Sequence, residues 1–191
     1  MNGPKPPRLL LITGRPGSGK TTLVAEAAAA VGRRAGGFYT REIRTEGRRV
    51  GFEVVTLDGR RGRLAHAGVK GPYRVGRYGV DLESFEAVGV DALERAVREK
   101  DLILIDEVGK MELLSDPFRR AVEAAVNSGK PVLAAVMLGP DPWVDRFKAH
   151  PEARLIFLTP ENRAPVRAEV RAWLKEWGLL ADAPSSPRPP G

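Results

Sequence analysis

The stretch "GRPGSGKT", from Gly14 to Thr21, decides the fold. It fits the pattern G-x-x-x-x-G-K-[ST] at every fixed position. The apolar run "RLLLIT" at 8–13 precedes it, and "KTTLVAEAAAAVG" after it predicts a helix that ends at Gly32. A strand, a glycine loop and a helix in this order open a βαβ unit. The stretch therefore predicts an α/β fold with a phosphate-binding loop, called the phosphate loop below.

The residues of the phosphate loop are candidate nucleotide contacts. They are Gly14, Arg15, Pro16, Gly17, Ser18, Gly19, Lys20 and Thr21. Backbone N–H groups converge on a phosphate only where side chains do not intrude, which explains the glycines. We expect Lys20 to bridge the β- and γ-phosphates and the Thr21 hydroxyl to coordinate Mg²⁺. For Thr22 we expect a structural role, although its hydroxyl can reach the α-phosphate. Arg15 either lies over the phosphates or faces water.

Two adjacent acids follow a second apolar strand in "LILIDEVGKMEL" at 102–113. Beside a phosphate loop, Asp106 is predicted to hold Mg²⁺ and Glu107 to orient or deprotonate the water that attacks the γ-phosphate. This order of acids is typical of P-loop ATPases of the additional-strand class. A structural alternative stays open for both residues, with Asp106 as a helix N-cap and Glu107 as an acid of the first helical turn.

Four more polar residues are candidates for the same site. Phosphoryl transfer needs positive charge at the γ-phosphate, and Arg41 after "FYT" and Lys110 after the two acids can supply it. Asn162 and Arg163 follow the last strand in "TPENR", where they can flank a nucleotide base. A solvated surface charge is the alternative for each basic residue.

The remaining patterns complete an α/β chain. Further apolar strands are predicted at 131–137 and 153–159, and helices at 82–87, 90–99, 116–128 and from about Pro160 to Trp177, with a short helix or loop in "PWVDRFKAH". Alternating residues between turn signals predict an antiparallel β-meander at about 36–65, and a polar connection at 66–81. We expect a P-loop NTPase three-layer sandwich with a mostly parallel central sheet. Residues 1–180 form one domain in this interpretation, and 181–191 form a Pro-rich disordered tail.

Composition narrows the class of protein. The 191 residues include no cysteine, which excludes disulfides and thiolate metal sites and fits a reducing compartment. No apolar run approaches a signal h-region or a membrane span, so we expect a soluble cytoplasmic protein with no membrane partner. The net charge of +7 permits contact with nucleic acid or phosphate-rich molecules, but the basic residues are scattered as on a solvated surface.

Several motifs together resemble the THEP or cancer-related nucleoside-triphosphatase family. They are "ITGRPGSGKTTLV", "GGFYTREIR", "RVGFEVVTLDG", "VGRYGVDLESFE", "LILIDEVGKMEL" and "LTPENR", in order over about 8–175. The resemblance implies a P-loop α/β domain that hydrolyses the terminal phosphate of ATP, GTP and other nucleoside triphosphates with Mg²⁺. It implies nucleotide contacts at 14–21 and about 102–109. One departure is "GPDPWVDRF", which stands where the family has a His-Pro-like element.

The motifs and the family resemblance together lead to one expected function and two alternative functions. We expect a Mg²⁺-dependent nucleoside-triphosphatase in which Lys20 and the loop amides bind phosphate, Thr21 and Asp106 hold the metal, and Glu107 activates water. The enzyme rival is a P-loop nucleotide or small-molecule kinase, with the Arg-rich segment 60–77 as its lid. A nucleic-acid-associated ATPase ranks last, because the sequence contains no basic patch interleaved with aromatic residues. The oligomeric state is left open.

Overall fold

Apolar side chains on both faces of the central strands place the sheet inside the molecule. In the computed structural model, which describes residues 5–180, Leu9 and Leu11 of the first strand belong to one buried hydrophobic cluster. Leu10 and Ile12, on the opposite face, belong to a second cluster. A strand buried on both faces is typical of a sheet covered by helices on each side. The apolar run "RLLLIT" is therefore a central strand, as predicted.

The described residues form a nine-stranded sheet. The strands are β1 (Leu9–Thr13), β2 (Ala35–Thr45), β3 (Arg48–Thr56), β4 (Arg61–His66), β5 (Arg74–Val75), β6 (Tyr78–Val80), β7 (Leu102–Val108), β8 (Val132–Val136) and β9 (Ala153–Phe157). Their order across the sheet is β5-β6-β4-β3-β2-β7-β8-β1-β9. Neighbouring strands in the series β2, β7, β8, β1 and β9 pair in parallel. Neighbouring strands in the series β2, β3, β4, β6 and β5 pair antiparallel. The sheet thus has a parallel half and an antiparallel half.

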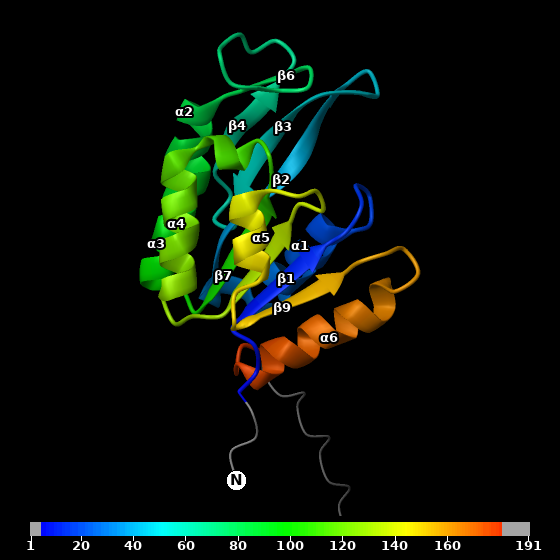
Figure 1. Ribbon diagram of the computed structural model, residues 1–191, viewed down its shortest axis with the longest axis vertical. Helices are drawn as coiled ribbons and strands as arrows, with labels where there is room; N and C mark the ends of the chain where they lie inside the picture. The colour runs from blue at the N-terminus through cyan, green and yellow to red at the C-terminus, as the bar shows by residue number, and fades with distance from the viewer. Residues whose placement is uncertain (1–4, 181–191) are drawn as a thin grey trace, which may run out of the picture.

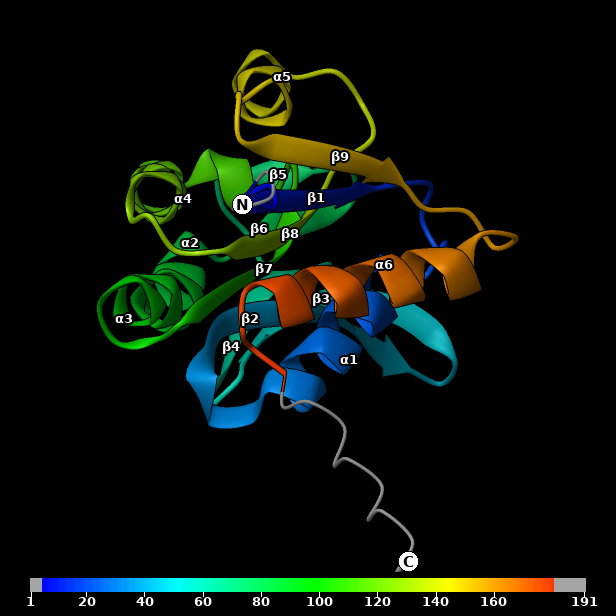
Figure 2. The ribbon, with the colours of Figure 1, turned by 90° about the horizontal axis from the view of Figure 1, so that it is seen from below.

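Helices cover the two faces of the parallel half (Figures 1 and 2). The helices are α1 (Lys20–Val31), α2 (Leu82–Phe85), α3 (Asp91–Glu99), α4 (Asp116–Asn127), α5 (Pro142–Lys148) and α6 (Arg163–Glu176), with short helical turns η1 (Gly32–Arg34), η2 (Glu86–Val90) and η3 (Glu112–Leu114). Of these, α2 and η2 lie against β4 in the antiparallel half. Buried side chains of α3, α4 and α5 join the first hydrophobic cluster, and those of α1 and α6 join the second. The chain is therefore a mixed α/β fold.

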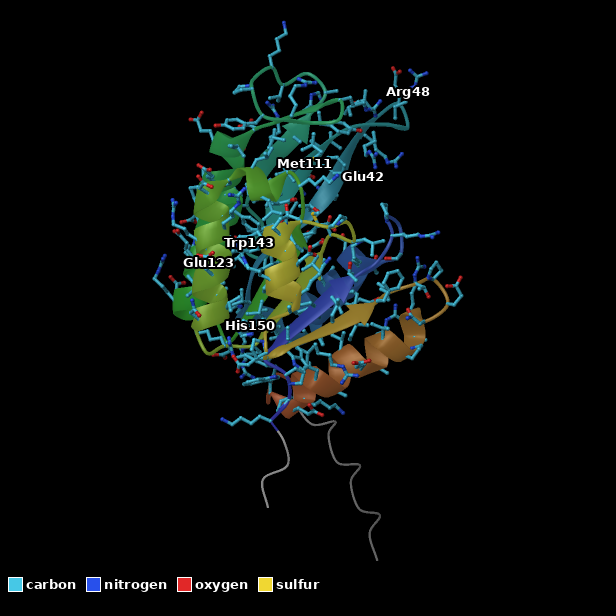
Figure 3. The ribbon with its side chains drawn as sticks, viewed as in Figure 1. Glu42, Arg48, Met111, Glu123, Trp143 and His150 are labelled. Atoms are coloured by element: carbon cyan, nitrogen blue, oxygen red, sulfur yellow. The ribbon has the colours of Figure 1, made fainter. Side chains whose placement is uncertain are left out.

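Capping side chains explain where α4 and α5, two helices of the first hydrophobic cluster, begin. Ser115 caps α4 by accepting a hydrogen bond from the Phe118 amide, and Asp141 caps α5 in the same way through two amides. In Figure 3, Trp143 of α5 points toward Glu123 of α4, and its indole N–H donates to that carboxylate over 3.3 Å. The segment "PWVDRFKAH", predicted as a short helix or loop, thus forms helix α5, which is hydrogen-bonded to α4.

The second apolar strand differs from its prediction. β7 continues from Leu102 to Val108, so that Asp106 and Glu107 lie inside the strand. The next helical turn, η3, begins only at Glu112. Neither acid is a helix cap or part of a first helical turn, and the structural alternative for the two acids is wrong.

The antiparallel region also differs in extent from the predicted segment 36–65. Residues 35–38 of β2 pair in parallel with β7, so β2 belongs to both halves of the sheet. Antiparallel pairing continues through β6 and β5, which lie in the segment predicted as a connection at 66–81. Short strands in a Gly- and Arg-rich segment lack a hydrophobic alternation that would reveal them. The predicted tail at 181–191 lies outside the described residues.

No helix within residues 5–180 combines the length and the apolar character that crossing a membrane requires.

Candidate active site

The phosphate loop connects the carboxyl end of β1 to the amino end of α1. Gly14 has no room for a side chain, because a Cβ there would lie 2.4 Å from the Leu158 carbonyl oxygen and 2.8 Å from the Ser18 hydroxyl. Gly19 precedes α1 with φ at +106°, a conformation that L side chains rarely adopt. Two of the three loop glycines are thus explained by contact and by conformation.

Lys20 lies over the phosphate loop. Its ammonium group donates to the Gly14 carbonyl over 2.9 Å and to the Arg15 carbonyl over 3.4 Å. The side chain is only 11% exposed. A cation held in this way, next to the partly positive amino end of α1, favours an anionic ligand at the loop.

Arg163 supports the loop from the first turn of α6. Its guanidinium donates to the Ser18 carbonyl over 2.7 Å and to the Gly17 carbonyl over 2.8 Å. It also lies 3.1 Å from the position of a Cβ on Gly19. The sequence predicted Arg163 as a neighbour of a nucleotide base, which stays a prediction; its side-chain hydrogen bonds in the structure are to carbonyls of the phosphate loop.

Asp106 is a buried carboxylate beside this loop. Its side chain is 1% exposed, and its Oδ2 atom has no hydrogen-bond partner among the described residues. The neighbouring Thr21 side chain opposes part of the rise in the pKa of this carboxyl group that burial causes. Burial, with a smaller contribution from the Glu107 charge, raises the pKa of Asp106 to about 7. The structure thus brings together the two predicted metal ligands.

Glu107 faces Lys20 across the site. A distance of 3.9 Å separates a carboxylate oxygen of Glu107 from the Lys20 ammonium nitrogen, and the Glu107 side chain is one-third exposed. Burial raises the pKa of Glu107, and the positive charge of Lys20 opposes that shift. The peptide bond that joins Asp106 to Glu107 is cis. Glu107 is thus a carboxylate next to the cation of the phosphate loop.

A third acid, Glu112, was missed by the sequence prediction. It is 5% exposed, and burial raises its pKa to about 8, with the Glu107 charge as the second cause. The only signal in the sequence is an acid placed between the apolar residues Met111 and Leu113. That pattern does not distinguish a buried carboxyl group from one that faces solvent.

Apart from Asp106, these groups all line one cavity of about 800 Å³. Its lining includes the phosphate loop residues Gly14, Pro16, Gly17, Gly19, Lys20 and Thr21, together with Thr22, Arg41, Glu107, Lys110, Glu112 and Arg163. Met111 and Glu42, labelled in Figure 3, line it from the turn after β7 and from β2. The elements that follow β1 and β7 thus share one cavity with the antiparallel half of the sheet.

The other predicted residues have separate environments. Arg41 and Lys110 line the cavity, and Arg41 donates to Glu53 over 2.7 Å. The Asn162 amide is engaged in its own turn, because it accepts from the Thr159 N–H over 2.8 Å and donates to the Phe157 carbonyl over 2.8 Å. Arg15 is exposed, and neither it nor Asn162 is among the residues that line the cavity.

The antiparallel half of the sheet forms one wall of the cavity, which we call the far wall. Phe52, Leu64 and Val75 line it, together with Arg49. None of the arginines in the predicted lid at 60–77 lines the cavity, and eight of the 18 residues of that segment lie in β4 and β5. The lid prediction therefore fails for the arginine side chains.

Arginines and aromatic rings do meet near this wall. The Arg49 guanidinium lies 5.2 Å from the centroid of the Phe52 ring and 5.9 Å from that of Tyr78, and Arg77 lies 5.0 Å from the Tyr78 centroid. The sequence did not reveal this cluster because Arg49 and Tyr78 are distant along the chain. The structure thus places arginines over aromatic rings that the sequence prediction did not find, but Tyr78 is buried in the hydrophobic core.

The donor set at Asp106 and Thr21 fits Mg²⁺, which prefers oxygen ligands and keeps several waters. The Oδ2 atom of Asp106, which has no hydrogen-bond partner, is a buried carboxyl oxygen with a lone pair available to a cation. No group of three or more His, Asp or Glu residues in the described part of the chain could hold a metal ion. A cation at this site would therefore take most of its ligands from water or from phosphate.

Comparisons with known proteins give consistent results. A family model described as NTPase matches residues 9–171. The nucleoside-triphosphatase THEP1 of Thermotoga sp. (strain RQ2) is 48% identical over 166 residues, which cover 87% of this chain and 95% of that protein. The crystal structure of THEP1 from Aquifex aeolicus superposes with a TM-score of 0.81 at 38% identity and covers 87% of this chain and 99% of its own. The solution structure of a human cancer-related nucleoside triphosphatase gives a TM-score of 0.74 at 35% identity, with 88% and 97% covered.

Proposed function

This chain belongs to the NTPase family that includes the THEP1 nucleoside-triphosphatases, and on that basis we propose that it hydrolyses the terminal phosphate of ATP, GTP and other nucleoside triphosphates with Mg²⁺. One observation carries the proposal. The cavity places the phosphate loop and Lys20 opposite Glu107, with 3.9 Å between the ammonium and carboxylate groups. A phosphate held at Lys20 would therefore have a general base within reach.

The residues act together in the following way. The loop amides and Lys20 bind the β- and γ-phosphates and stabilise their charge. Glu107 accepts a proton from a water molecule as the water oxygen forms a bond to the γ-phosphorus. The bond from that phosphorus to the β,γ-bridging oxygen breaks, and the nucleoside diphosphate leaves. The raised pKa of Glu107 makes its carboxylate a stronger base than an exposed one.

Thr21 and Asp106 would hold Mg²⁺ next to the phosphates. The metal supplies charge neutralisation to the γ-phosphate oxygens when bound. Arg41 and Lys110 are proposed to add positive charge from the cavity wall, where both side chains lie. Arg163 keeps the loop carbonyls of Gly17 and Ser18 turned away from the phosphates.

We further infer that the architecture is a P-loop NTPase three-layer sandwich, in which β3, β4, β5 and β6 are an antiparallel addition to a parallel core. The continuous sheet supports a single domain for the described residues. The cytoplasmic location stays a prediction.

The test is phosphate release by the purified protein with each nucleoside triphosphate, with Mg²⁺ present or chelated. Wild type should release phosphate from all of them, and chelation should abolish release. Lys20→Ala and Glu107→Gln should each lower turnover by about 100-fold or more, since general-base catalysis alone contributes roughly 10²–10⁴-fold. Full turnover by Lys20→Ala would exclude the assignment of the site.

A kinase is the second candidate, and the far wall of the cavity favours it. Phe52, Leu64 and Val75 line the same cavity as Lys20 and Glu107, so a second substrate could pack against apolar side chains there. A hydrolase releases phosphate without an acceptor, whereas a kinase needs one. The same assay with added nucleosides or nucleoside monophosphates separates the two.

Arg49 and Arg77 are the reason to add RNA or DNA in one part of this assay, since arginine contacts are common in single-strand binding. Tyr78 is buried in the core and offers no open ring on which a base could stack. If RNA neither binds at moderate salt nor alters turnover, the nucleic-acid-associated reading fails.

A further inference from the structure

The net positive charge of the chain is concentrated in the antiparallel half of the sheet, and is not scattered over the whole surface as we expected. Residues 41–77 contain ten lysines and arginines against four aspartates and glutamates, so they carry six of the seven net positive charges. This segment forms β3, β4, β5 and the outer part of β2, and it lies at the end of the molecule away from α6 (Figure 1). A surface of one sign attracts polyanions from solution.

Three cations at the tip of this half have no carboxylate partner. Lys70, Arg74 and Arg77 form no ion pair with any acid among residues 5–180. Hydrogen bonds order the two arginines, because Arg74 donates to the Arg77 carbonyl over 2.8 Å, and Arg77 donates to the Arg49 carbonyl and to the Tyr78 hydroxyl. Each guanidinium has five N–H donors, so donors remain for a phosphate. We call Lys70, Tyr73, Arg74 and Arg77 the basic tip.

Tyr73 places an open aromatic ring next to these cations. It directly precedes Arg74, and its carbonyl accepts from the Val80 amide of β6 over 2.9 Å, which fixes the backbone. Its side chain is 48% exposed, so a flat ligand can reach the ring. Tyr73 and Lys70 also line a surface hollow of about 690 Å³, which leaves room for such a ligand.

The acids near the tip indicate where a ligand's own charge would lie. Asp81 and Glu83 line the hollow beside Tyr73, whereas Arg74 and Arg77 do not line it. A neutral ring therefore suits the hollow, and negative charge suits the two arginines outside it. The two environments belong to adjacent residues, Tyr73 and Arg74.

This combination distinguishes among polyanions. A single-stranded nucleic acid presents unpaired bases that stack on aromatic rings, and a phosphate at each nucleotide. A duplex keeps its bases stacked inside, and an acidic peptide offers carboxylates without a ring at each step. Guanidinium groups also match the geometry of phosphate oxygens. We propose that the basic tip binds single-stranded RNA or DNA, with a base stacked on Tyr73 and phosphates held by Arg74 and Arg77.

The basic tip is separate from the phosphate loop. None of its four residues lines the nucleotide cavity, although Arg49, whose carbonyl accepts from Arg77, does. A strand at the tip would thus lie next to the far wall without entering the phosphate loop. The proposal therefore goes beyond nucleotide hydrolysis and does not depend on which residue is the base.

Fluorescence anisotropy without nucleotide tests the proposal, using labelled oligouridylate and oligothymidylate of about 12 nucleotides over a series of salt concentrations. Wild type should bind both, with a slope of log affinity against log salt of about −1.4 to −2, since two or three cations meet phosphates. Tyr73→Ala should weaken binding by about 5- to 150-fold at an unchanged slope, and Tyr73→Phe by less than about twofold. Arg74→Ala should make the slope shallower by about 0.7.

Two variants in the parallel half are matched controls. Phe157 of β9 is exposed to the same extent as Tyr73, at 48%, and lies at the opposite edge of the sheet. Arg171 of α6 is exposed as well. Phe157→Ala and Arg171→Ala should each bind within about twofold of wild type. Phosphate release without nucleic acid should be the same for Tyr73→Ala and wild type.

Several results would overturn the proposal. They are the absence of binding at about 50 mM salt, wild-type affinity in Tyr73→Ala, and equal or tighter binding of a duplex of the same length. Equal or tighter binding of polyglutamate, or of vesicles with equal parts of phosphatidylcholine and phosphatidylserine, would assign the tip to an acidic protein or a membrane surface instead. A failure of the hydrolase assignment would appear in phosphate release and would leave these titrations unchanged.

Discussion

The phosphate loop and the acid turn, which we define as Asp106 to Glu112, form the same cavity by opposite means. In the loop, one short stretch supplies glycines, backbone amides and the Lys20 cation, and its contacts are mostly to backbone. The acid turn gathers three carboxyl groups, of which Asp106 and Glu112 are almost fully buried. Burial raises the pKa of each of the three acids.

The difference teaches how the protein divides its tasks. The loop is a rigid anion site, because close backbone contacts fix its shape. The acid turn depends on flexible side chains, whose charge state follows from what surrounds them. Substitutions in the two regions should therefore differ in kind as well as in size.

The largest effect is expected from Gly14→Ala in the loop. The new methyl group would meet the Leu158 carbonyl oxygen at 2.4 Å, and backbone cannot move aside cheaply. We expect loss of nucleotide binding together with a decrease in kcat/KM of about 100-fold or more, comparable with a misplaced catalytic group. Calorimetric titration with an ATP analogue and steady-state kinetics measure both. Normal binding by this variant would mean that the loop is not rigid.

The second prediction concerns the pH dependence of stability. The folded-state pKa of Glu112, about 8, lies above its ordinary value of 4.5, so protonation stabilises the folded state fully below about pH 4.5. That contribution is lost as pH rises through 8, by at most about 1.4 kcal/mol per pH unit. Asp106 contributes with the same sign. Glu112→Gln should flatten the decline between pH 5 and 8 by an amount on the order of 2 kcal/mol.

Denaturant unfolding at several pH values, without nucleotide, measures this difference. Parallel curves for wild type and Glu112→Gln would show that Glu112 titrates as an exposed acid does.

Gly109→Ala places the same methyl group in the acid turn and should cost less than Gly14→Ala. Its Cβ would meet the ends of the Glu107 and Glu112 side chains at 2.9 Å and 3.0 Å, and these can rotate away. We expect kcat to fall by about tenfold, while binding of the ATP analogue is retained, because the base moves and the loop does not. A loss of binding equal to that of Gly14→Ala would remove the distinction between the two regions.

The smallest effect is expected at α6. Arg163→Ala removes two hydrogen bonds to loop carbonyls and should lower the free energy of unfolding by about 1 kcal/mol and weaken nucleotide binding a few-fold. Arg154→Ala is the control, because Arg154 pairs with Glu169 of α6 at an exposed position and does not line the cavity. Exposed pairs of this kind contribute about 0.2–1 kcal/mol. Equal effects on nucleotide binding would argue against a loop-orienting role for Arg163.

The features predictable from the sequence are those with local causes. The phosphate loop, α1 and the apolar strands β1 and β8 follow from glycine positions and from hydrophobic runs. The proximity of Thr21 and Asp106 was also predictable, because parallel strands bring their carboxyl ends to one edge of the sheet.

The features that were missed depend on contacts between distant segments. Glu112 is buried by the turn after β7, and Arg49 meets Tyr78 only once β3 and β6 are placed in the sheet. Arg163 resembles any first-turn arginine until its partners, the carbonyls of Gly17 and Ser18, are seen. Hydrophobic patterns report which face of an element is buried and not which distant polar group lies against it.

The dual pairing of β2 has a consequence for the order in which the chain folds. On its antiparallel side, β2 pairs with β3 through a tight turn, so that these contacts close a short loop. On its parallel side, Ala35 to Phe38 pair with residues 102–105 of β7, and β1 pairs with β8, more than a hundred residues away. Contacts at short sequence separation form faster than those that must close long loops. The hairpin of β2 and β3 is therefore expected to form early, and the edge of the sheet that carries the phosphate loop and the acids to assemble late.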